Sequence, residues 1–299
     1  MSTLAIPQLV ALNGVYPAFG GGWPVYFTTG MIQTYAGAGE IFGAPPARGQ
    51  LVSVQQLPML YSIFGSAYGG NGPTQFALPN LDQRSVVGGQ RVGLQGQGTL
   101  TMTYMIAVEA AGMAPFVGAV VAFGGSRIPE GWLPADGSLL QIDACNGLFG
   151  AIGNRFGGDG ETNFALPNLN GAAAVGTGAG VVLGQKLSGP VPGLGLNYAI
   201  CAGGGIYPSP GGNGSFPDNE PFLGQVLACA AMQLPKGWMA CDGALLDARQ
   251  NPALFSLLGY AYGGSGPTFA LPDLRGKMIV GGTAGAQAAE APQMPMPTA

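Results

Sequence analysis

The chain has 299 residues, of which 47% are hydrophobic and only 8% are charged, with a formal net charge of −4 and no histidine. A nucleic-acid-binding protein needs a basic stripe to neutralise phosphates, so this balance excludes that class of partner. Without histidine, the Ser–His and Cys–His pairs of hydrolases are excluded too, and we expect no enzyme, no cofactor and no metal site. The 55 glycines and 25 prolines indicate an ordered, turn-rich β protein, because disordered chains are polar and charged.

The first residues, MSTLAIPQLVALNG, carry neither a basic region nor an obvious cleavage site of a secretory signal. No apolar run is long enough for a membrane helix, so we expect no membrane insertion. A surface with so few charges suits a chain that is covered by copies of itself, or a fibre outside the cell. We therefore expect an extracellular, cell-surface or virion-tail location.

Residues 1–22 are predicted to form a separate N-terminal strand. Its apolar side chains are Ile6, Leu9, Val10, Leu12, Val15 and Tyr16. The strand runs into Gly-Val-Tyr-Pro at 14–17, which nearly matches Gly-Ile-Tyr-Pro at 205–208. The N-terminal strand is therefore similar to a strand that lies late in the chain.

Three copies of one motif follow: YGGNGPTQFALPNL at 68–81, FGGDGETNFALPNL at 156–169 and YGGSGPTFALPDL at 262–274. A repeat of this length indicates tandem domains rather than a single fold. We place repeat 1 at 23–116, repeat 2 at 117–216 and repeat 3 at 217–284. A tail rich in proline and alanine follows at 285–299.

Each repeat is predicted to be α+β, rich in strands and turns. It begins with an apolar β stretch, as at 117–123 and 223–229, and two shorter strands follow. Residues 251–258 are expected to make about two turns of helix, with Gly259 as the stop. In Phe-Ala-Leu-Pro the proline keeps the preceding leucine extended. The phenylalanines and leucines of this motif are the expected core anchors, namely Phe76, Leu78, Phe164, Leu166, Phe269 and Leu271.

A further strand is predicted after each of the first two motifs, at 100–108 and 196–201, and none after Gly282. The chain thus reads as a strand followed by three units, the last of which lacks its closing strand. If the spare strand fills that slot in another molecule, the contact repeats without closing and makes a filament. If it fills the slot in its own molecule, the three units close into a ring. A third interpretation makes it a leader strand on repeat 1.

Two pairs of equivalent residues are candidates for a site. Asp136 and Asp242 each open an Asp-Gly turn, and we interpret them as acceptors of backbone hydrogen bonds rather than as a catalytic pair. Trp132 and Trp238 end a Pro-x-Gly-Trp motif. We expect these rings to pack in the core, with a glycan platform as the alternative.

Asp159 lies in Gly-Gly-Asp-Gly, where a carboxylate and loop carbonyls would suit calcium. The matching residues are Asn71 and Ser265, so no ligand set repeats. Arg84 and Arg275 follow the Leu-Pro-Asn/Asp-Leu motif. We expect them to tie the loop to a neighbouring carboxylate.

The four cysteines are Cys145, Cys201, Cys229 and Cys241. Cys229 and Cys241 lie on apolar stretches on either side of a Pro-Lys-Gly turn. If these stretches pair as a hairpin, the two thiols would face each other and form a disulfide. The alternative is that both are buried free thiols.

The combination of Pro-x-Gly-Trp, Asp-Gly-x-Leu-Leu, Leu-Phe-Ser-Leu-Leu-Gly, Tyr-Gly-Gly-x-Gly and Phe-Ala-Leu-Pro-Asp-Leu-Arg-Gly resembles the phage tail collar domain family, which includes the bacterial microcystin-dependent proteins. Repeat 3 is close to this pattern throughout, repeat 2 fits it well, and repeat 1 lacks the tryptophan and the aspartate. The resemblance implies a structural or adhesive role and no catalysis. In short tail fibres the related domain is trimeric and is associated with a histidine-bound metal. This chain has no histidine, so that metal site is not carried over.

We therefore predict a structural subunit of a self-assembling extracellular fibre. Its partners would be copies of itself, joined head to tail when the N-terminal strand of one subunit completes repeat 3 of the next. The alternative is a phage or tail-like fibre or collar component that binds a cell-surface receptor or glycan through exposed loops.

Overall fold

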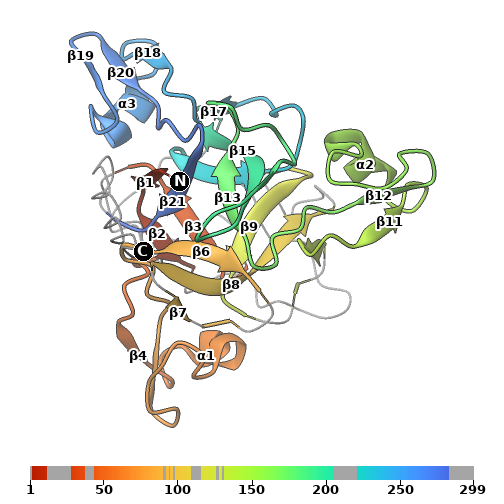
Figure 1. Ribbon diagram of the computed structural model, residues 1–299. Coiled ribbons are helices and arrows are strands. Elements are labelled where there is room, and N and C mark those ends of the chain that lie inside the picture. The colour runs from red at the N-terminus through yellow and green to blue at the C-terminus, as the bar shows by residue number, and fades with distance from the viewer. Residues whose placement is uncertain are drawn as a thin grey trace, which may run out of the picture.

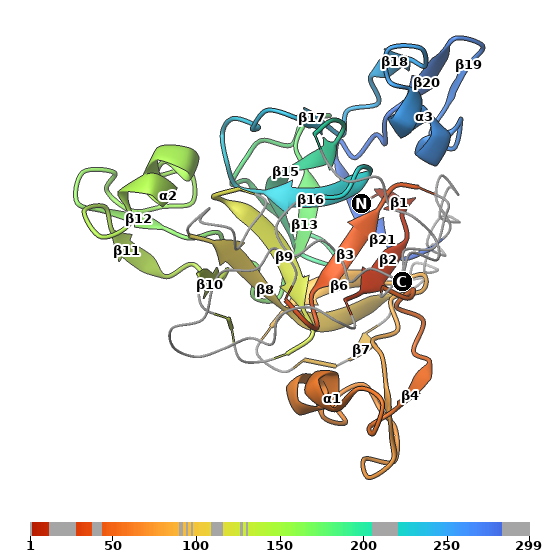
Figure 2. The same ribbon diagram turned by 180° about the vertical axis from the view of Figure 1, so that it is seen from behind.

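The computed structural model describes residues 2–11, 28–37, 44–89, 92–93, 95–96, 98–108, 116–125, 128–129, 131–204 and 221–282. A central body of strands carries three lobes that project in different directions (Figures 1 and 2). Each lobe holds one short helix, and each comes from one sequence repeat. The predicted strand-rich fold of three tandem units is confirmed.

The elements of the three repeats follow one pattern. Repeat 1 contains β3 (Ile32–Tyr35), β4 (Leu51–Ser53), α1 (Pro58–Phe64), β5 (Gln75–Ala77) and β6 (Ser85–Gly88). Repeat 2 contains β9 (Ala119–Phe123), β10 (Trp132–Pro134), β11 (Leu139–Gln141), α2 (Asn146–Ile152), β12 (Asn163–Ala165) and β13 (Ala173–Gly176). Repeat 3 contains β16 (Gln225–Cys229), β17 (Trp238–Ala240), β18 (Leu245–Asp247), α3 (Pro252–Leu258), β19 (Gly264–Ser265), β20 (Thr268–Ala270) and β21 (Lys277–Val280).

The other strands join one repeat to the next. They are β1 (Ser2–Ala5), β2 (Gln8–Val10), β7 (Gln95–Gly96), β8 (Thr99–Ala107), β14 (Lys186–Leu187) and β15 (Gly193–Cys201). The first half of β8 pairs in parallel with β6 of repeat 1, and its second half pairs antiparallel with β9 of repeat 2. In the same way, β15 pairs in parallel with β13 and antiparallel with β16. One closing strand therefore completes one repeat and opens the next.

The N-terminal strands connect repeat 3 to repeat 1 in the same way. β1 pairs in parallel with β21, with Ser2 opposite Lys277 and Ala5 opposite Val280. β2 pairs antiparallel with β3. In the single chain the slot of repeat 3 is thus filled by the chain's own N-terminus, and the three repeats close into a ring.

This finding corrects the predicted strand in detail. We expected one run from Ile6 to Tyr16, but the strand that meets repeat 3 begins at Ser2, and Ile6 and Pro7 separate it from β2. Pro7 has no N–H for a ladder, which explains the break. Ile6, Leu9 and Val10 are buried. Three further predicted strand residues lie outside the described part of the chain, namely Leu12, Val15 and Tyr16.

The three first strands of the repeats meet at the centre of the ring. The start of each pairs with the end of another: Met31 with Phe123, Ala119 with Cys229, and Gln225 with Tyr35. These three pairs occupy equivalent places, so they are related by a pseudo-three-fold axis. Three steps complete the circle and leave no open edge among these strands.

The lobes form around the predicted anchors. Phe76, Phe164 and Phe269 are each fully buried, and each ring packs on an aromatic residue of the helix in its own lobe, with centroids 5.3 to 5.4 Å apart. The anchoring leucines are buried as well, namely Leu78, Leu166 and Leu271. The helix predicted at 251–258 is confirmed as α3, and the N–H of Gly259 ends it on the carbonyl of Phe255. At 52°, the φ of Gly259 is one that glycine adopts readily.

Candidate functional site

We call the contacts between successive repeats junctions 1–2, 2–3 and 3–1. A backbone link recurs at each junction, at the end of the last strand of a repeat. The carbonyl of Gly88 accepts a hydrogen bond from Gly171 N at 2.8 Å, and the carbonyl of Gly176 accepts one from Gly276 N at 2.8 Å. At junction 3–1 the carbonyl of Gly281 accepts from Gln83 N at 2.9 Å. The three repeats are thus linked head to tail in a circle.

Glycine is required at these three places by space. A Cβ on Gly88, Gly176 or Gly281 would collide with a backbone carbonyl oxygen of the next repeat. That carbonyl belongs in each case to the last leucine of the Phe-Ala-Leu-Pro-Asn/Asp-Leu motif, which is Leu169, Leu274 or Leu81. The motif therefore positions the junction as well as the lobe.

The tyrosine that opens the repeat motif also reaches across a junction. Tyr68 Oη donates to the carbonyl of Gly124 at 2.7 Å, across junction 1–2. Tyr262 Oη donates to the carbonyl of Ala36 at 2.8 Å, across junction 3–1. Burial raises the pKa of both phenols well above its usual range, so they stay protonated donors. At junction 2–3 the equivalent residue is Phe156, which has no hydroxyl.

Junction 3–1 buries more polar groups than the other two. Gln225 Nε2 donates to Gln33 Oε1 at 2.7 Å, and both side chains are at most 2% exposed. The places equivalent to Gln33 hold Val121 and Leu227. Ser85 Oγ donates to the carbonyl of Ile279 at 2.9 Å, from repeat 1 to repeat 3. At junction 3–1 these buried side chains therefore add hydrogen bonds between the repeats, in places where the other two junctions have apolar residues.

The Asp-Gly turns have the geometry expected from the sequence. Asp136 Oδ1 accepts from the N–H of Ser138, and Asp242 Oδ1 accepts from the N–H of Ala244, each at 3.0 Å. The two carboxylates lie in different repeats, next to different junctions. They are turn residues with one oxygen engaged.

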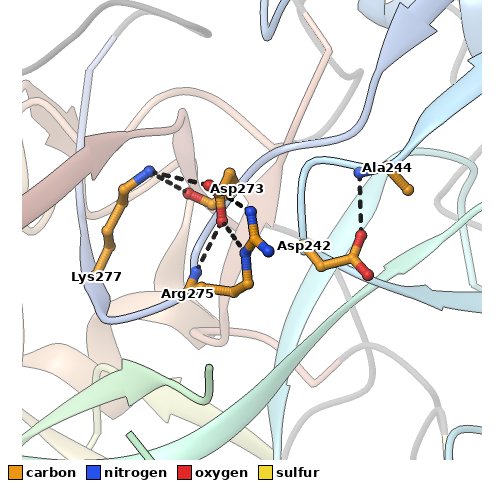
Figure 3. Close-up of polar contacts among 5 residues, drawn as sticks. All are labelled: Asp242, Ala244, Asp273, Arg275 and Lys277. Carbon is orange, nitrogen blue, oxygen red and sulfur yellow. Dashed lines mark hydrogen bonds and ion pairs between the residues drawn. The ribbon is translucent and has the colours of Figure 1, made fainter. Parts of the chain in front are cut away.

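Asp273 gathers the charged groups near junction 2–3 (Figure 3). Arg275 Nε lies 2.9 Å from Asp273 Oδ1, and Lys277 Nζ lies 3.6 Å from Oδ2 and donates to the Asp273 carbonyl at 2.9 Å. The hydrogen bond from Arg275 holds the pKa of Asp273 below its usual range. The expected tie of Arg275 to a carboxylate is thus present. Arg84 instead donates to the carbonyl of Asn80, which makes Lys277 its counterpart.

The Asp159 carboxylate has no room for a cation. Its oxygens accept hydrogen bonds from the N–H groups of residues 161, 162 and 163 and from the side chains of Thr162 and Asn163, all at 2.7 to 2.9 Å. These bonds, that from the Asn163 N–H first, lower its pKa. Asn71 ties its own loop in a similar way. We interpret Asp159 as the polar centre of a tight loop.

Comparison with protein-family models gives three matches to the phage tail collar domain, at 30–86, 118–174 and 224–279. Together they cover more than half of the chain, and each lies inside one predicted repeat. The chain belongs to the phage tail collar domain family. Its match is to a structural domain of phage tails, of the fibre or collar type. No curated protein and no solved structure matches the chain.

The tryptophans of the collar repeats are core residues. Trp132 and Trp238 are 5% and 8% exposed, and Phe116, which precedes β9, packs edge-on against Trp238 of repeat 3 with centroids 5.2 Å apart. The glycan platform is therefore wrong. In repeat 1 the tryptophan is replaced by buried Ala44, and Tyr35 takes up the space against Phe222.

The possible disulfide between Cys229 and Cys241 is absent, and both thiols are free and buried. The stretches that carry them do not pair as a hairpin, because β15 lies between β16 and β17 and pairs with both. Burial raises the pKa of Cys229 to about 12, so its thiolate is unavailable for exchange. Cys145 and Cys201 are free too.

In the described part of the chain, no group of three acidic or cysteine side chains is close enough to hold a metal ion. No helix among the described residues is long and apolar enough to span a membrane. The functional elements of the structure are thus the three junctions and the lobes between them.

Sequence reasoning missed the glycines of the junctions. They recur as the second residue of Val-Gly at 87–88, 175–176 and 280–281, at the same distance after the last leucine of the motif in all three repeats. Aligning the repeats beyond the motif would have found them. The buried Gln33–Gln225 pair had no such signal, because it joins residues that differ between the repeats.

Proposed function

We propose that this collar-family protein is a structural subunit of an extracellular or tail-associated fibre that assembles head to tail by strand donation. In the assembly, Ser2–Val10 of one molecule fills the gap between β21 and β3 of the next. The N-terminal strand is the donated segment, and the slot that accepts it lies in repeat 3 of the same chain. Repetition of this one contact builds a polymer from a single kind of subunit.

The observation that carries the proposal is the register of β1 on β21. Ser2 to Ala5 face Lys277 to Val280 in parallel, as Thr99 to Met102 face Ser85 to Gly88 within the chain. The slot of repeat 3 accepts a strand of the same direction and length as the covalent junctions do. A donated strand would meet these same groups whichever molecule supplies it.

The connection to the rest of the chain allows an exchange. Residues 28–31 belong to the ring, as the pairing of Met31 with Phe123 and the hydrogen bond from Gly124 N to the Gly30 carbonyl show. The connection to the donated segment is therefore residues 12–27, and a chain of that length spans at most roughly 55 Å. The donated segment can therefore leave its own ring without moving any repeat. Only β1 and β2 need to change molecule.

The second candidate is a closed, monomeric module that binds a surface receptor through its lobes. It is favoured by the fact that all three junctions of the single chain are filled. Each lobe then projects from a complete ring and presents an exposed leucine in an equivalent place, namely Leu51, Leu139 and Leu245.

Negative-stain electron microscopy of the purified chain is the first test. Fibres with a repeat of one molecule are expected from strand donation, and discrete particles from the closed module. A cysteine experiment then locates the strand. Thr3→Cys and Met278→Cys change facing residues, and neighbouring strands bring such residues within disulfide range.

The two variants are made separately, each with Cys145→Ser, and mixed under oxidising conditions. Disulfide-linked dimers are expected, because each chain carries only one of the two new thiols. The matched control is Thr3→Cys mixed with Val86→Cys. Val86 lies in β6 of repeat 1, whose slot is filled by β8, a strand that continues into repeat 2. If the first mixture gives no more dimer than the control, while a chain that carries both changes closes on itself, strand donation is wrong and the closed module replaces it.

A further inference from the structure

Two pockets occupy the same place in the ring, one at junction 1–2 and one at junction 2–3. Their volumes are about 350 and 240 Å³. Each is bounded by a closing strand, by the end of β10 or β17, and by the Asp-Gly turn that follows. The recurrence of a cavity at equivalent positions indicates a property of the junction rather than a packing defect.

A tyrosine lines each pocket, Tyr104 the first and Tyr198 the second. Their hydroxyls donate to the carbonyls of Val86 and Ala174 at 3.4 and 3.3 Å. Because the hydroxyl is engaged there, the part of each tyrosine left for a ligand is its ring.

The rim of each pocket is polar. Asp136 lines the first pocket and Asp242 the second, and the described hydrogen bonds of both carboxylates fall on Oδ1. Figure 3 shows Asp242 with its second oxygen in contact with none of the residues drawn. Asn170 also lines the first pocket, and Arg275, which pairs with Asp273, lines the second.

The side walls are aliphatic. Ile128 and Leu234 hold equivalent places, and so do Pro134 and Ala240. A carboxylate opposes an anionic ligand, and the described residues hold no cluster for a metal ion. The chemistry that remains is that of a neutral ring with one apolar face and an edge of hydroxyl groups.

From these contacts we infer that the two pockets bind neutral sugar residues of a glycan. The C–H face of a pyranose would lie on the tyrosine ring, and its hydroxyls would donate to the free Asp oxygen and accept from Asn170 or Arg275. The first volume is at the lower end of the usual range for ligand pockets and the second is below it, which suits a single sugar ring. This site is independent of whether the N-terminal strand is donated.

Junction 3–1 does not repeat this chemistry. Arg48 stands where the other junctions have Asp136 and Asp242, and Asp82 stands where they have the donor. Gln8 takes the place of the pocket tyrosine, because it pairs with Thr34 of β3 as Tyr104 pairs with Ala122 of β9. The proposed sites are therefore the two pockets at junctions 1–2 and 2–3. Junction 3–1 is where the N-terminal strand binds.

The test is a ¹H–¹⁵N NMR titration of the full chain with the methyl glycosides of glucose, galactose, mannose and N-acetylglucosamine. We expect saturable shifts of the amides of Ala135 and Asp136 in the first pocket, and of Cys241 and Asp242 in the second. Asp242→Asn keeps the acceptor for the Ala244 N–H and removes the charge. It should weaken binding in the second pocket at least tenfold, as loss of a charge-assisted hydrogen bond does, and leave the first pocket unchanged.

Ala240→Trp fills the second pocket and should abolish its shifts. The control is Asp247→Asn, an aspartate of β18 outside both pockets, which should change neither. A polysaccharide that displays the bound sugar should bind the wild type far more tightly than Ala240→Trp, because two sites act together. Equal binding of the two would point to free sugars as ligands. If no probe gives saturable shifts, or if the second pocket responds unchanged in Asp242→Asn and Ala240→Trp, the inference is overturned.

Discussion

Junctions 1–2 and 2–3 differ from junction 3–1 in how the closing strand is held. At the first two, one unbroken strand of nine residues completes a repeat and enters the next. At junction 3–1 the strand is broken into β1 and β2, and it joins repeat 3 through hydrogen bonds and packing alone. The same geometry is thus built twice with a covalent connection and once without.

The side chains near the break between β1 and β2 also differ from those at the other two junctions. Thr103 Oγ1 and Asn197 Nδ2 sit in equivalent places and donate to the carbonyls of Gly125 and Ala231 at 2.9 and 2.8 Å. The equivalent residue at junction 3–1 is Pro7, which has no donor. The terminal junction gives up this contact and replaces apolar seam residues with glutamines.

Removing the terminal strand is the largest test of this comparison. Deletion of residues 2–10 takes away Ile6, Leu9 and Val10, each at most 2% exposed, and burial of three such side chains stabilises by roughly 5–9 kcal/mol. We expect the melting temperature to fall sharply and any fibres to disappear. A synthetic peptide of residues 1–11, added in excess, should restore the melting temperature by binding the empty slot. An unchanged melting temperature would contradict the closure of the ring by this strand.

A smaller change separates the junctions one at a time. Gly88→Ala, Gly176→Ala and Gly281→Ala each push a methyl group against a leucine carbonyl of the next repeat, and such overpacking costs about 1–3 kcal/mol. We expect Gly88→Ala and Gly176→Ala to lower the free energy of unfolding. Gly281→Ala should instead act mainly by loosening β21 from repeat 1, and so increase the exchange of β1, read from the cysteine mixtures.

The control for these glycines is Gly150→Ala. Gly150 lies within α2, where an added Cβ meets nothing within 4 Å. Alanine in a helix interior is favoured over glycine by about 0.5–1 kcal/mol, so this variant should be slightly stabilised. If Gly281→Ala behaves like Gly150→Ala, the backbone link at junction 3–1 has no part in closure.

The predictable parts of this fold are those whose sequence recurs in all three repeats. The anchors at Phe76, Phe164 and Phe269 and the helix stop at Gly259 follow from the motif, because each rests on a local rule of proline, glycine or core packing. A spare N-terminal strand for the slot of repeat 3 was predicted too, but at Ile6 to Tyr16, whereas the strand that fills the slot is Ser2–Ala5. Of the two alternatives for Cys229 and Cys241, the disulfide is wrong, because β15 comes between the two stretches and nothing local in the sequence shows it.

The pockets were beyond sequence reasoning for a similar reason. Asp136 and Tyr104 belong to different repeats, and the pairing of β10 with β8 brings them to one cavity. The sequence shows Asp136 as a turn residue, which it is, and shows nothing of what lies across the junction. Sites made between repeats are visible only once the arrangement of the repeats is known.

The hydrogen bonds of Tyr262 and Tyr68 allow a matched comparison of two junctions, and the expected loss of stability is moderate. Tyr262→Phe removes the bond to Ala36 at junction 3–1, and Tyr68→Phe removes the bond to Gly124 at junction 1–2. Each leaves a buried carbonyl unpaired, which costs about 1–3 kcal/mol. We expect both variants to unfold at lower denaturant concentration, but only Tyr262→Phe to speed the exchange of β1. Equal exchange rates in the two variants would show that the bond does not guard the terminal junction.

The smallest effect is expected from the ion pairs beside junction 2–3. Asp273→Asn keeps the turn acceptor, as Asn80 and Asn168 do in their own repeats, and removes the charge that faces Arg275 and Lys277. These groups are partly exposed, so the loss at pH 7 should be below about 1 kcal/mol. The pKa of Asp273 is lowered in the folded chain. Its contribution is therefore complete above the unfolded-state pKa of about 3.9 and is lost as the pH falls through the lower folded-state value. The difference in melting temperature between wild type and variant should be largest near neutral pH, shrink in acid, and shrink again in 1 M salt. A difference that persists in acid would mean that Asp273 acts through its turn geometry, and the charge would then have no share in stabilising this part of repeat 3.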